Sequence, residues 1–358
     1  MKICFIAPAN NYHTKKWAGW FASHGHEVHV ISFVTGYIPD VNVHVILTGA
    51  DPEGSDASKL KYLLHARKLK TIADEIKPDI VHVHYATSYG TAAALSGIRN
   101  YLLSVWGSDI YEFPRKSILH RIMLEFSLRR AALILSTSKA MAKETRRYTR
   151  KKIVITPFGV DMNLFSPQKR TRAPKDGKFI IGTVKTLSET YGISSILKAA
   201  AIVQKQLQIP LEIRIAGKGP QEEEYKALAR QIGIDSITVW LGFISQEDAA
   251  SEWANMDLAL IPSALESFGV SAVEAQACGT PVIISAVPGL MESTKPGLTS
   301  VTVKPNSAEC LAEAVIALYR DSEKRRRMSA AGRRFVKTRF ELNRCFQRIE
   351  RIYRSLKK

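Results

Sequence analysis

Two glutamates, Glu266 and Glu274, bracket a stretch of small and apolar residues that reads ESFGVSAVEAQACGTP. Ser267 is a preferred helix N-cap residue, and Gly279 suits the position just past a helix end. The pattern therefore predicts a helix over about residues 268–278. It places one carboxylate just before the helix and the other between one and two turns into it.

The first turn of this helix is a candidate anion site. Backbone N–H groups near Phe268, Gly269 and Val270 have no partner within the helix and carry partial positive charge, which suits a phosphate or diphosphate. Carboxylates do not bind phosphate, but Glu266 and Glu274 can accept hydrogen bonds from hydroxyls at either end of it. A nucleotide-diphosphate sugar has such hydroxyls on its ribose and on its hexose. The alternative is that both glutamates solvate a surface turn.

The elements that position these residues alternate along the whole chain. Short β-branched and apolar runs such as KICFIAP, IVHVHYA, FIIGTV and LALIPS are separated by helical patterns, which predicts βαβ units and mainly parallel sheets. The polar, basic segment SPQKRTRAPKDGK over residues 166–178 is the best linker candidate. We expect two Rossmann-like doubly wound domains facing across a cleft, with ligands at the carboxyl ends of their strands. The expected parts are residues 1–168, residues 169–340 and a C-terminal helix over 341–358 that packs back toward the first domain.

Composition narrows the class of protein. The 358 residues are 46% hydrophobic and 23% charged, as in globular proteins, and two domains are the default at this length. No apolar run approaches the length of about 20 residues that spans a bilayer, and the N-terminus reads as a strand rather than a signal peptide. The four cysteines match no metal or redox spacing, so we expect reduced thiols in a cytoplasmic protein.

The formal net charge of +18 suits nucleic acid, an anionic membrane surface or a phosphorylated substrate, and a generally basic surface is the alternative. The segments RKSILHRIMLEFSLRRAALIL and KAMAKETRRYTRKK concentrate basic residues in the first domain. They would suit peripheral binding to the inner face of the plasma membrane. Nucleic acid is disfavoured because no stacking aromatics interleave the basic runs.

In this order, ESFGVSAVE, TPFGVDMNLF, AGKGPQEEEYKALA and WANMDLALIPS resemble the retaining family 4 glycosyltransferases of the GT-B fold, over nearly the whole chain. The Glu-x7-Glu pattern is the most specific mark. The resemblance implies transfer of a sugar from a nucleotide-diphosphate sugar to a hydroxyl acceptor, a lipid-linked or cell-envelope glycan, with retained anomeric configuration. It implies neither a metal nor another cofactor. The alternatives are a nucleotide-sugar 2-epimerase of the same fold and a basic protein that binds nucleic acid or another anion without catalysis.

The resemblance also assigns donor residues. Glu274 would hold the ribose hydroxyls, and Glu266 would contact the transferred sugar. Backbone amides of Phe268, Gly269 and Val270 would meet the sugar and the diphosphate.

The diphosphate clamp departs from the family pattern. The family carries an Arg and a Lys on the loop after the first strand of the second domain, where this chain has GTVKTLSETYGI. Lys185 is the expected cation, next to Gly182 on the preceding strand. The usual Lys-Gly pair is replaced by Tyr191-Gly192, and Lys218 is the candidate second cation.

The first domain supplies the acceptor-side candidates. The loop PANNYHTKKW places Asn10, Asn11 and His13 after the first strand. The usual His-Gly appears as Trp106-Gly107, and Asp109 is expected to orient the sugar or the acceptor. His82 and His84 share a face of their strand; without a third ligand, a strand-end contact is favoured over a metal pair.

Overall fold

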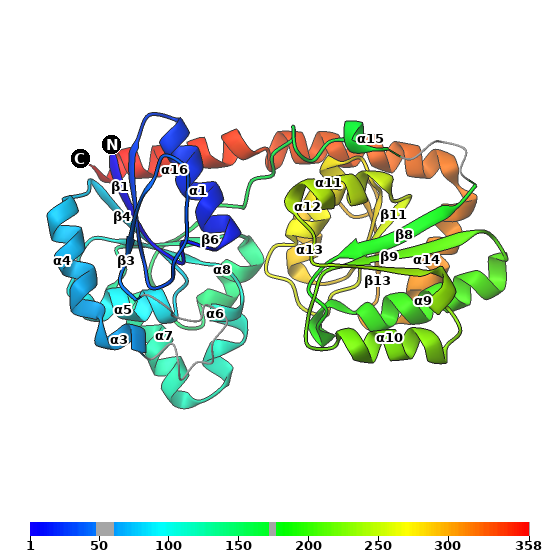
Figure 1. The fold of residues 1–358 in the computed structure, drawn as a ribbon, viewed down its shortest axis with the longest axis horizontal. Helices are drawn as coiled ribbons and strands as arrows, with labels where there is room; N and C mark the ends of the chain where they lie inside the picture. Colours follow the sequence, from blue (N-terminus) through cyan, green and yellow to red (C-terminus); the bar gives the residue numbers. More distant parts are fainter. Residues whose placement is uncertain (48–60, 172–176, 358) are drawn as a thin grey trace. The chain divides into compact units, whose positions relative to one another are not determined.

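The computed structural model describes residues 1–47, 61–171 and 177–357, which form two compact α/β units (Figure 1). Residues Met1–Pro157 together with Phe346–Lys358 make the first unit, and Phe158–Cys345 make the second. The change of unit at Pro157/Phe158 falls earlier than residue 168, because Phe158 packs on Phe268 of the second unit with ring centroids 6.4 Å apart. Part of the expected linker, residues 172–176, lies outside the described residues.

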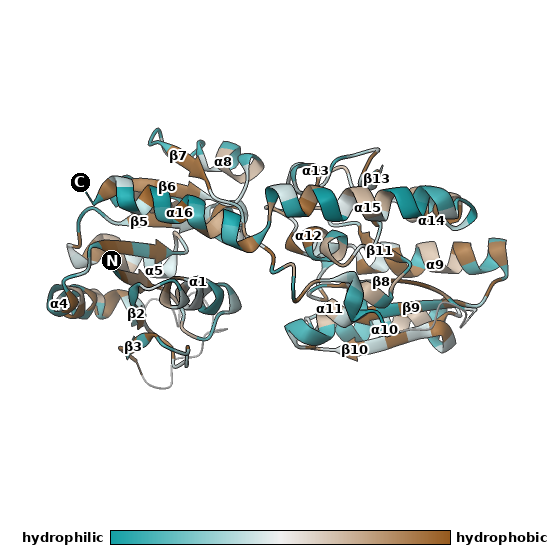
Figure 2. Cartoon of the chain, turned by 90° about the horizontal axis from the view of Figure 1, so that it is seen from above, coloured by the Kyte–Doolittle hydropathy of each residue, from teal (hydrophilic) through white to brown (hydrophobic). Residues whose placement is uncertain are grey.

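The first unit contains a parallel sheet with strand order β3-β2-β1-β4-β5-β6-β7. The runs ICFI in β1 and LIL in β6 are continuous and apolar, which is typical of parallel sheets covered on both faces; β5 and β6 are brown in Figure 2. The strands are β1 (Lys2–Ile6), β2 (Glu27–Ser32), β3 (Asn42–Val45), β4 (Ile80–His84), β5 (Leu102–Val105), β6 (Leu133–Ser136) and β7 (Ile153–Ile155).

The helices of the first unit form two groups. The first group is α1 (Tyr12–Ser23) and the C-terminal helix α16 (Leu342–Leu356), which pack together: Phe346 stacks on Trp20, and Tyr353 stacks on Phe21. The second group covers residues of β1, β2, β4, β5 and β6 in one hydrophobic core. It comprises α3 (Lys61–Leu64), α4 (Ala66–Ile76), α5 (Ser88–Ser96), α6 (Ser108–Tyr111), η1 (Phe113–Arg115), α7 (Ile118–Arg130) and α8 (Lys139–Thr145).

The second unit contains a parallel sheet with strand order β10-β9-β8-β11-β12-β13. Its strands are β8 (Phe179–Val184), β9 (Leu211–Ala216), β10 (Thr238–Gly242), β11 (Leu258–Ile261), β12 (Val282–Ser285) and β13 (Ser300–Val303). In Figure 1, α9, α10 and α14 lie on one side of this sheet, and α11, α12 and α13 lie on the other. The helices are η2 (Pro167–Lys169), η3 (Glu189–Tyr191), α9 (Ile193–Leu207), α10 (Glu222–Gln231), η4 (Asp235–Ile237), α11 (Gln246–Asn255), α12 (Val270–Ala277), α13 (Pro288–Ser293), α14 (Ala308–Arg320) and α15 (Ser322–Arg339).

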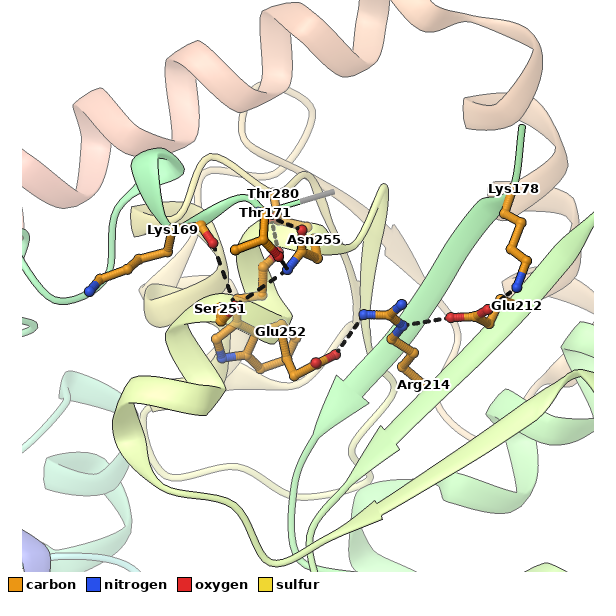
Figure 3. Close-up of polar contacts among 10 residues, drawn as sticks. Lys169, Thr171, Lys178, Glu212, Arg214, Ser251, Glu252, Asn255 and Thr280 are labelled. Carbon is orange, nitrogen blue, oxygen red and sulfur yellow. Dashed lines mark hydrogen bonds and ion pairs between the residues drawn. The ribbon is translucent and has the colours of Figure 1, made fainter. Parts of the chain in front are cut away.

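A chain of ion pairs stabilises β9 of the second sheet (Figure 3). Glu212 accepts from Lys178 and from Arg214, at 2.7 Å each, and Arg214 also pairs with Glu252 of α11 at 3.2 Å. Burial alone would raise the pKa of Glu212, but the hydrogen bonds from Lys178 and Arg214 outweigh it and lower that pKa. Lys178 precedes β8 and Glu212 is near the start of β9, so this network belongs to the amino ends of the strands.

Two further observations bear on sequence expectations. None of the helices within residues 1–47, 61–171 and 177–357 is both long enough and apolar enough to cross a lipid bilayer. The four cysteines are free thiols; three of them, Cys4, Cys278 and Cys345, are buried.

Candidate functional site

The candidate donor site lies at the carboxyl ends of β8 and β11. These strands are neighbours, but the chain continues from β8 to β9 on one side and from β11 to β12 on the other. Open α/β sheets bind ligands at such a switch point, outside the carboxyl ends of the strands. The helices α9 and α12 begin there, so two helix N-termini lie beside the same edge.

An ion pair joins the two loops of this edge. Lys185, after β8, donates to Oε2 of Glu266, after β11, with 2.8 Å between the atoms, and both side chains are nearly enclosed. The hydroxyl of Ser263 donates to the same carboxylate oxygen at 3.3 Å. The structure therefore brings together two residues that sequence reasoning assigned to the site separately.

Lys185 also lies over an aromatic ring. Its Nζ is 4.3 Å from the centroid of Tyr191, the residue that stands where the family usually has a lysine. Burial alone would lower the pKa of Lys185, but the charges of Glu266 and Glu274 outweigh it, so the pKa is raised above its usual value. Lys185 is therefore a permanent cation, held between carboxylates and a ring face.

Glu274 is a buried carboxylate on α12, close enough to Lys185 to act on its charge. The expectation for the helix start was wrong in detail. α12 begins at Val270, and its N-cap is Gly269, with φ of 89° and no side-chain cap, rather than Ser267. A non-glycine residue is strained at this φ, and an added Cβ would lie 2.7 Å from Leu290 and 2.8 Å from Ser293. Gly269, as the N-cap, has no side chain that could bond to the N–H groups of this first turn.

Other neighbours shape this edge, and sequence reasoning missed them. Ser271 donates to the carbonyl of Val184 at 3.0 Å, which fixes α12 to the end of β8. An added Cβ on Gly289, at the start of α13, would come 2.1 Å from the carbonyl oxygen of Glu266. The segment AVPGL directly after the strand PVIIS was the available signal, since loops after parallel strands gather at this edge.

Three expected donor residues have other surroundings. Gly182 lies inside β8, where an added Cβ would approach the carbonyl oxygen of Arg214 to 2.1 Å, so this glycine permits close strand packing. The side chain of Phe268 is buried against Phe340 at 5.1 Å, which leaves only its backbone for a ligand. Lys218, on the loop after β9, has an exposed side chain. Its backbone carbonyl accepts a hydrogen bond from the N–H group of Leu187, so this loop lies beside the loop that carries Lys185.

The acceptor-side candidates lie at the switch point of the first sheet, between β1 and β4. Asn11 is the N-cap of α1: its side chain accepts from the N–H groups of His13 and Thr14. Asn10 is exposed, and the ring of His13 packs edge-on against Trp106 at 5.6 Å. Asn11 therefore orders the loop, whereas Asn10 and His13 stay candidates for acceptor contacts.

Trp106 and Asp109 are both buried after β5. The indole of Trp106 packs on His84 and Tyr85. The carboxylate of Asp109 accepts from the N–H groups of Ala86, Trp106 and Gly107 at 2.8 to 3.3 Å. Burial raises the pKa of Asp109 despite these hydrogen bonds. Asp109 thus positions the two loops that border the switch point, and its contact to a sugar stays a prediction.

His82 and His84 occupy the buried end of β4. His82 bonds through one ring nitrogen to the Tyr353 hydroxyl and through the other to Ser104, which ties α16 to the sheet. Neither ring nitrogen of His84 has a hydrogen-bond partner in the described part of the chain. Burial lowers the pKa of His82 to about 3. Burial, together with the charges of His82 and His13, lowers the pKa of His84 well below its usual value.

These imidazoles predict a loss of stability in acid. They stay neutral in the folded protein, whereas the unfolded chain binds protons as pH falls through about 6.5, so stability is lost below that pH. Replacing His84 with Phe should reduce the pH dependence of the unfolding free energy by about 1.4 kcal/mol per pH unit between pH 6 and pH 4. Urea titrations across this range measure it.

The matched variant is His82→Phe, which also removes an imidazole but breaks the hydrogen bonds to Tyr353 and Ser104. It should lose stability at pH 7 as well, by about 1 to 3 kcal/mol. If the unfolding free energy of His84→Phe changed with pH as steeply as that of the unmodified protein, the ring of His84 would not be buried in its neutral form.

Comparison with solved structures agrees with this architecture. Sucrose-phosphate synthase from Thermosynechococcus elongatus superposes with a TM-score of 0.84 at 21% identity, covering 99% of each chain. HepE from Anabaena, solved in complex with UDP-glucose, gives a TM-score of 0.79 at 20% identity, covering 99% of this chain and 100% of that one. The chain has two α/β units with parallel sheets of seven and six strands, and it superposes on these glycosyltransferase structures. Its fold is therefore of the GT-B class.

Sequence comparisons give the family. The model of glycosyl transferases group 1 matches residues 165–335, and the glycosyl transferase 4-like model matches residues 2–138. D-inositol 3-phosphate glycosyltransferase of Pseudarthrobacter chlorophenolicus is 28% identical over 361 residues, covering 90% of this chain and 84% of the relative. N-acetyl-alpha-D-glucosaminyl L-malate synthase of Bacillus anthracis is 25% identical over 352 residues, covering 93% and 90%. The chain belongs to the group 1 glycosyltransferases, with a family 4-like first unit, and is a sugar-transferring enzyme.

Proposed function

We propose that the enzyme moves a sugar from a nucleotide-diphosphate sugar to a hydroxyl of a lipid-linked or cell-envelope glycan, with retention of the anomeric configuration. The observation that carries the donor side is the cluster of Lys185, Glu266 and Glu274 beside the N-terminus of α12. It offers a cation and the N–H groups at the start of α12 for the diphosphate, and it offers carboxylates for the hydroxyls at both ends of the donor.

The diphosphate is the leaving group of the proposed reaction. Positive charge fixed in place before the reaction stabilises the charge that develops on it, and here Lys185 and the α12 N-terminus supply that charge. We therefore propose transfer without a divalent metal, so that excess EDTA leaves the rate unchanged. Without the donor, Lys185 is paired with Glu266. When the donor binds, the ammonium group of Lys185 would interact with both the carboxylate of Glu266 and the diphosphate.

Retention is proposed from the family resemblance. The bond from the anomeric carbon to the phosphate oxygen breaks, and the bond from that carbon to the acceptor oxygen forms on the same face. The leaving phosphate takes the proton of the acceptor hydroxyl, so no side chain has to act as the base. Glu266 would hold a hydroxyl of the transferred sugar, and Glu274 would hold the ribose.

Two observations bear on the acceptor side. The names of two relatives contain D-inositol 3-phosphate and L-malate, which are anionic compounds. The net charge of +18 fits an acceptor that carries phosphate or lies at an anionic membrane. We favour the lipid-linked acceptor, which would place the enzyme peripherally at the inner face of the plasma membrane; a small anionic acceptor is the second candidate.

A thermal-shift screen over nucleotides and nucleotide sugars tests the donor proposal. One nucleotide-diphosphate sugar should raise the melting temperature selectively, and the same donor should then support transfer to lipid-phosphate or small anionic acceptors. Release of nucleoside diphosphate without a glycosylated product would contradict transfer and favour an epimerase. A response to nucleic acid alone would favour an anion-binding protein.

A further inference from the structure

The second helix group of the first unit contains an apolar groove. The groove has a volume of about 1010 Å³ and lies between α7, α5, α3 and the segment after α8. Helices α3, α5 and α7 lie beside one another along this part of the unit in Figure 1. Its apolar lining residues are Leu63, Leu95, Ile122, Met123 and Phe126.

Large apolar side chains next to the groove are turned to solvent. On α7, Ile118 is 71% exposed, Leu119 60% and Ile122 55%. Leu95, at the end of α5, is also exposed. Single exposed apolar residues are common, but a contiguous set beside an apolar groove marks an interaction site.

Cations border the same groove, and three of them lack an acidic partner. Within the described residues, no carboxylate pairs with Arg129, Arg146 or Arg150, although all three line the groove and are exposed. The guanidinium of Arg129 lies over the ring of Phe126, 5.9 Å from its centroid. Nearby arginines differ in this respect: Arg121 pairs with Glu125 at 2.8 Å.

One kind of ligand would contact both the exposed apolar side chains and the arginines that have no acidic partner. Unpaired arginines attract an anionic surface, and apolar side chains that project beside them gain by leaving water. A soluble phosphate would use the arginines but leave Ile118, Leu119 and Ile122 in water. A bilayer with anionic phospholipids has phosphates at the depth of the arginines and acyl chains below them.

We propose that the groove and the exposed first turns of α7 form a docking surface for an anionic phospholipid bilayer. Ile118, Leu119 and Ile122 enter the headgroup region, and Arg129, Arg146 and Arg150 bind lipid phosphates. This deepens the proposed function, since it rests on an acceptor held at a membrane. The test uses neither donor nor acceptor, so failure of docking and failure of transfer are separate results.

Sedimentation with vesicles tests the docking surface. The unmodified protein should bind vesicles of equimolar phosphatidylglycerol and phosphatidylcholine, and bind phosphatidylcholine alone much more weakly. Replacing Arg129, Arg146 and Arg150 together with Gln should weaken partition into the anionic vesicles by about 100-fold. Circular dichroism and melting curves of each variant establish that it is folded.

The matched control removes the same charge elsewhere. Arg326, Arg334 and Lys337 are exposed on α15, so their triple Gln variant lowers the net charge equally. It should keep most of the vesicle binding, with a loss of less than about 5-fold. Equal losses in the two triple variants would show attraction by net charge alone and would overturn the proposal.

The apolar part has its own control. Ile118→Ser with Ile122→Ser should weaken vesicle binding about 10-fold or more, whereas Phe243→Ser, at a side chain 79% exposed in the second unit, should not. Unchanged binding in the first variant would show that the apolar side chains take no part, and competition by inorganic phosphate alone would show a soluble-phosphate site; either result would overturn the proposal. It would also fail if light scattering showed a dimer that the same variants dissociate.

Discussion

Glu274→Ala should weaken binding of the nucleotide-diphosphate sugar by about 100-fold or more. In the proposed complex this carboxylate accepts two ribose hydroxyls, and hydrogen bonds to a charged group contribute about 1.5 to 3 kcal/mol each. Its position within α12 and its burial mean that no neighbour on the surface can replace it. Calorimetric titration of the donor measures the loss, and Glu274→Gln keeps the volume if the alanine variant is unstable.

Glu266→Ala should be compared with Glu274→Ala, because the two variants are expected to affect different steps. Glu266 is expected to contact the transferred sugar and to hold Lys185, so its loss should lower turnover more than donor affinity. Glu313, exposed on α14, is the control, and Glu313→Ala should change neither. Donor binding by Glu274→Ala equal to that of the unmodified enzyme would contradict the assignment.

Lys185→Ala should lower turnover by about 100- to 1000-fold. Loss of one preorganised donor to a developing negative charge has an effect of this size in other enzymes. Lys185 is the cation that the structure places between Glu266 and the ring of Tyr191 at this edge of the sheet. Steady-state kinetics with saturating donor give the value, and the conservative Lys185→Arg should retain part of the rate.

Variants of Tyr191 test whether the contact of its ring with the ammonium group of Lys185 matters for turnover. Tyr191→Phe keeps the ring under the ammonium group and should keep the turnover within about 3-fold, whereas Tyr191→Ala removes the ring and should lower it about 10-fold. Full turnover in Lys185→Ala would mean that another group, such as Lys218, carries the diphosphate charge. That result would move the clamp to the loop after β9.

The sequence predicts the parts of the fold that depend on periodicity. Continuous apolar runs such as VIIS are typical of strands in a parallel sheet that is covered on both faces, and the structure has this run there as β12. The segment SKLKYLLHARKLKTIADEIKPD, residues 58–79, has the pattern of one basic amphipathic helix. The structure has two helices there, α3 and α4, and residues 48–60 lie outside the described part. Propensity predicts a helical segment but not where it is interrupted.

The donor site could be predicted only as separate residues. Glu266, Glu274 and the anion site follow from one local stretch, because all of them lie within a few residues of the start of one predicted helix. The pairing of Lys185 with Glu266 joins residues 81 positions apart and depends on β8 and β11 being neighbours, which no local pattern states. Likewise, the role of Asp109 as a loop anchor depends on N–H groups that only the folded backbone gathers.

The most direct test of the central claim is a binding cycle with two ligands and two proteins. Calorimetry should compare the nucleoside diphosphate selected by the donor screen with its 2′,3′-dideoxy analogue, on the unmodified enzyme and on Glu274→Ala. We predict that removing the hydroxyls weakens binding to the unmodified enzyme by about 100-fold and has almost no effect on the variant. Equal losses on both proteins would contradict a donor site in which Glu274 holds the ribose at the start of α12.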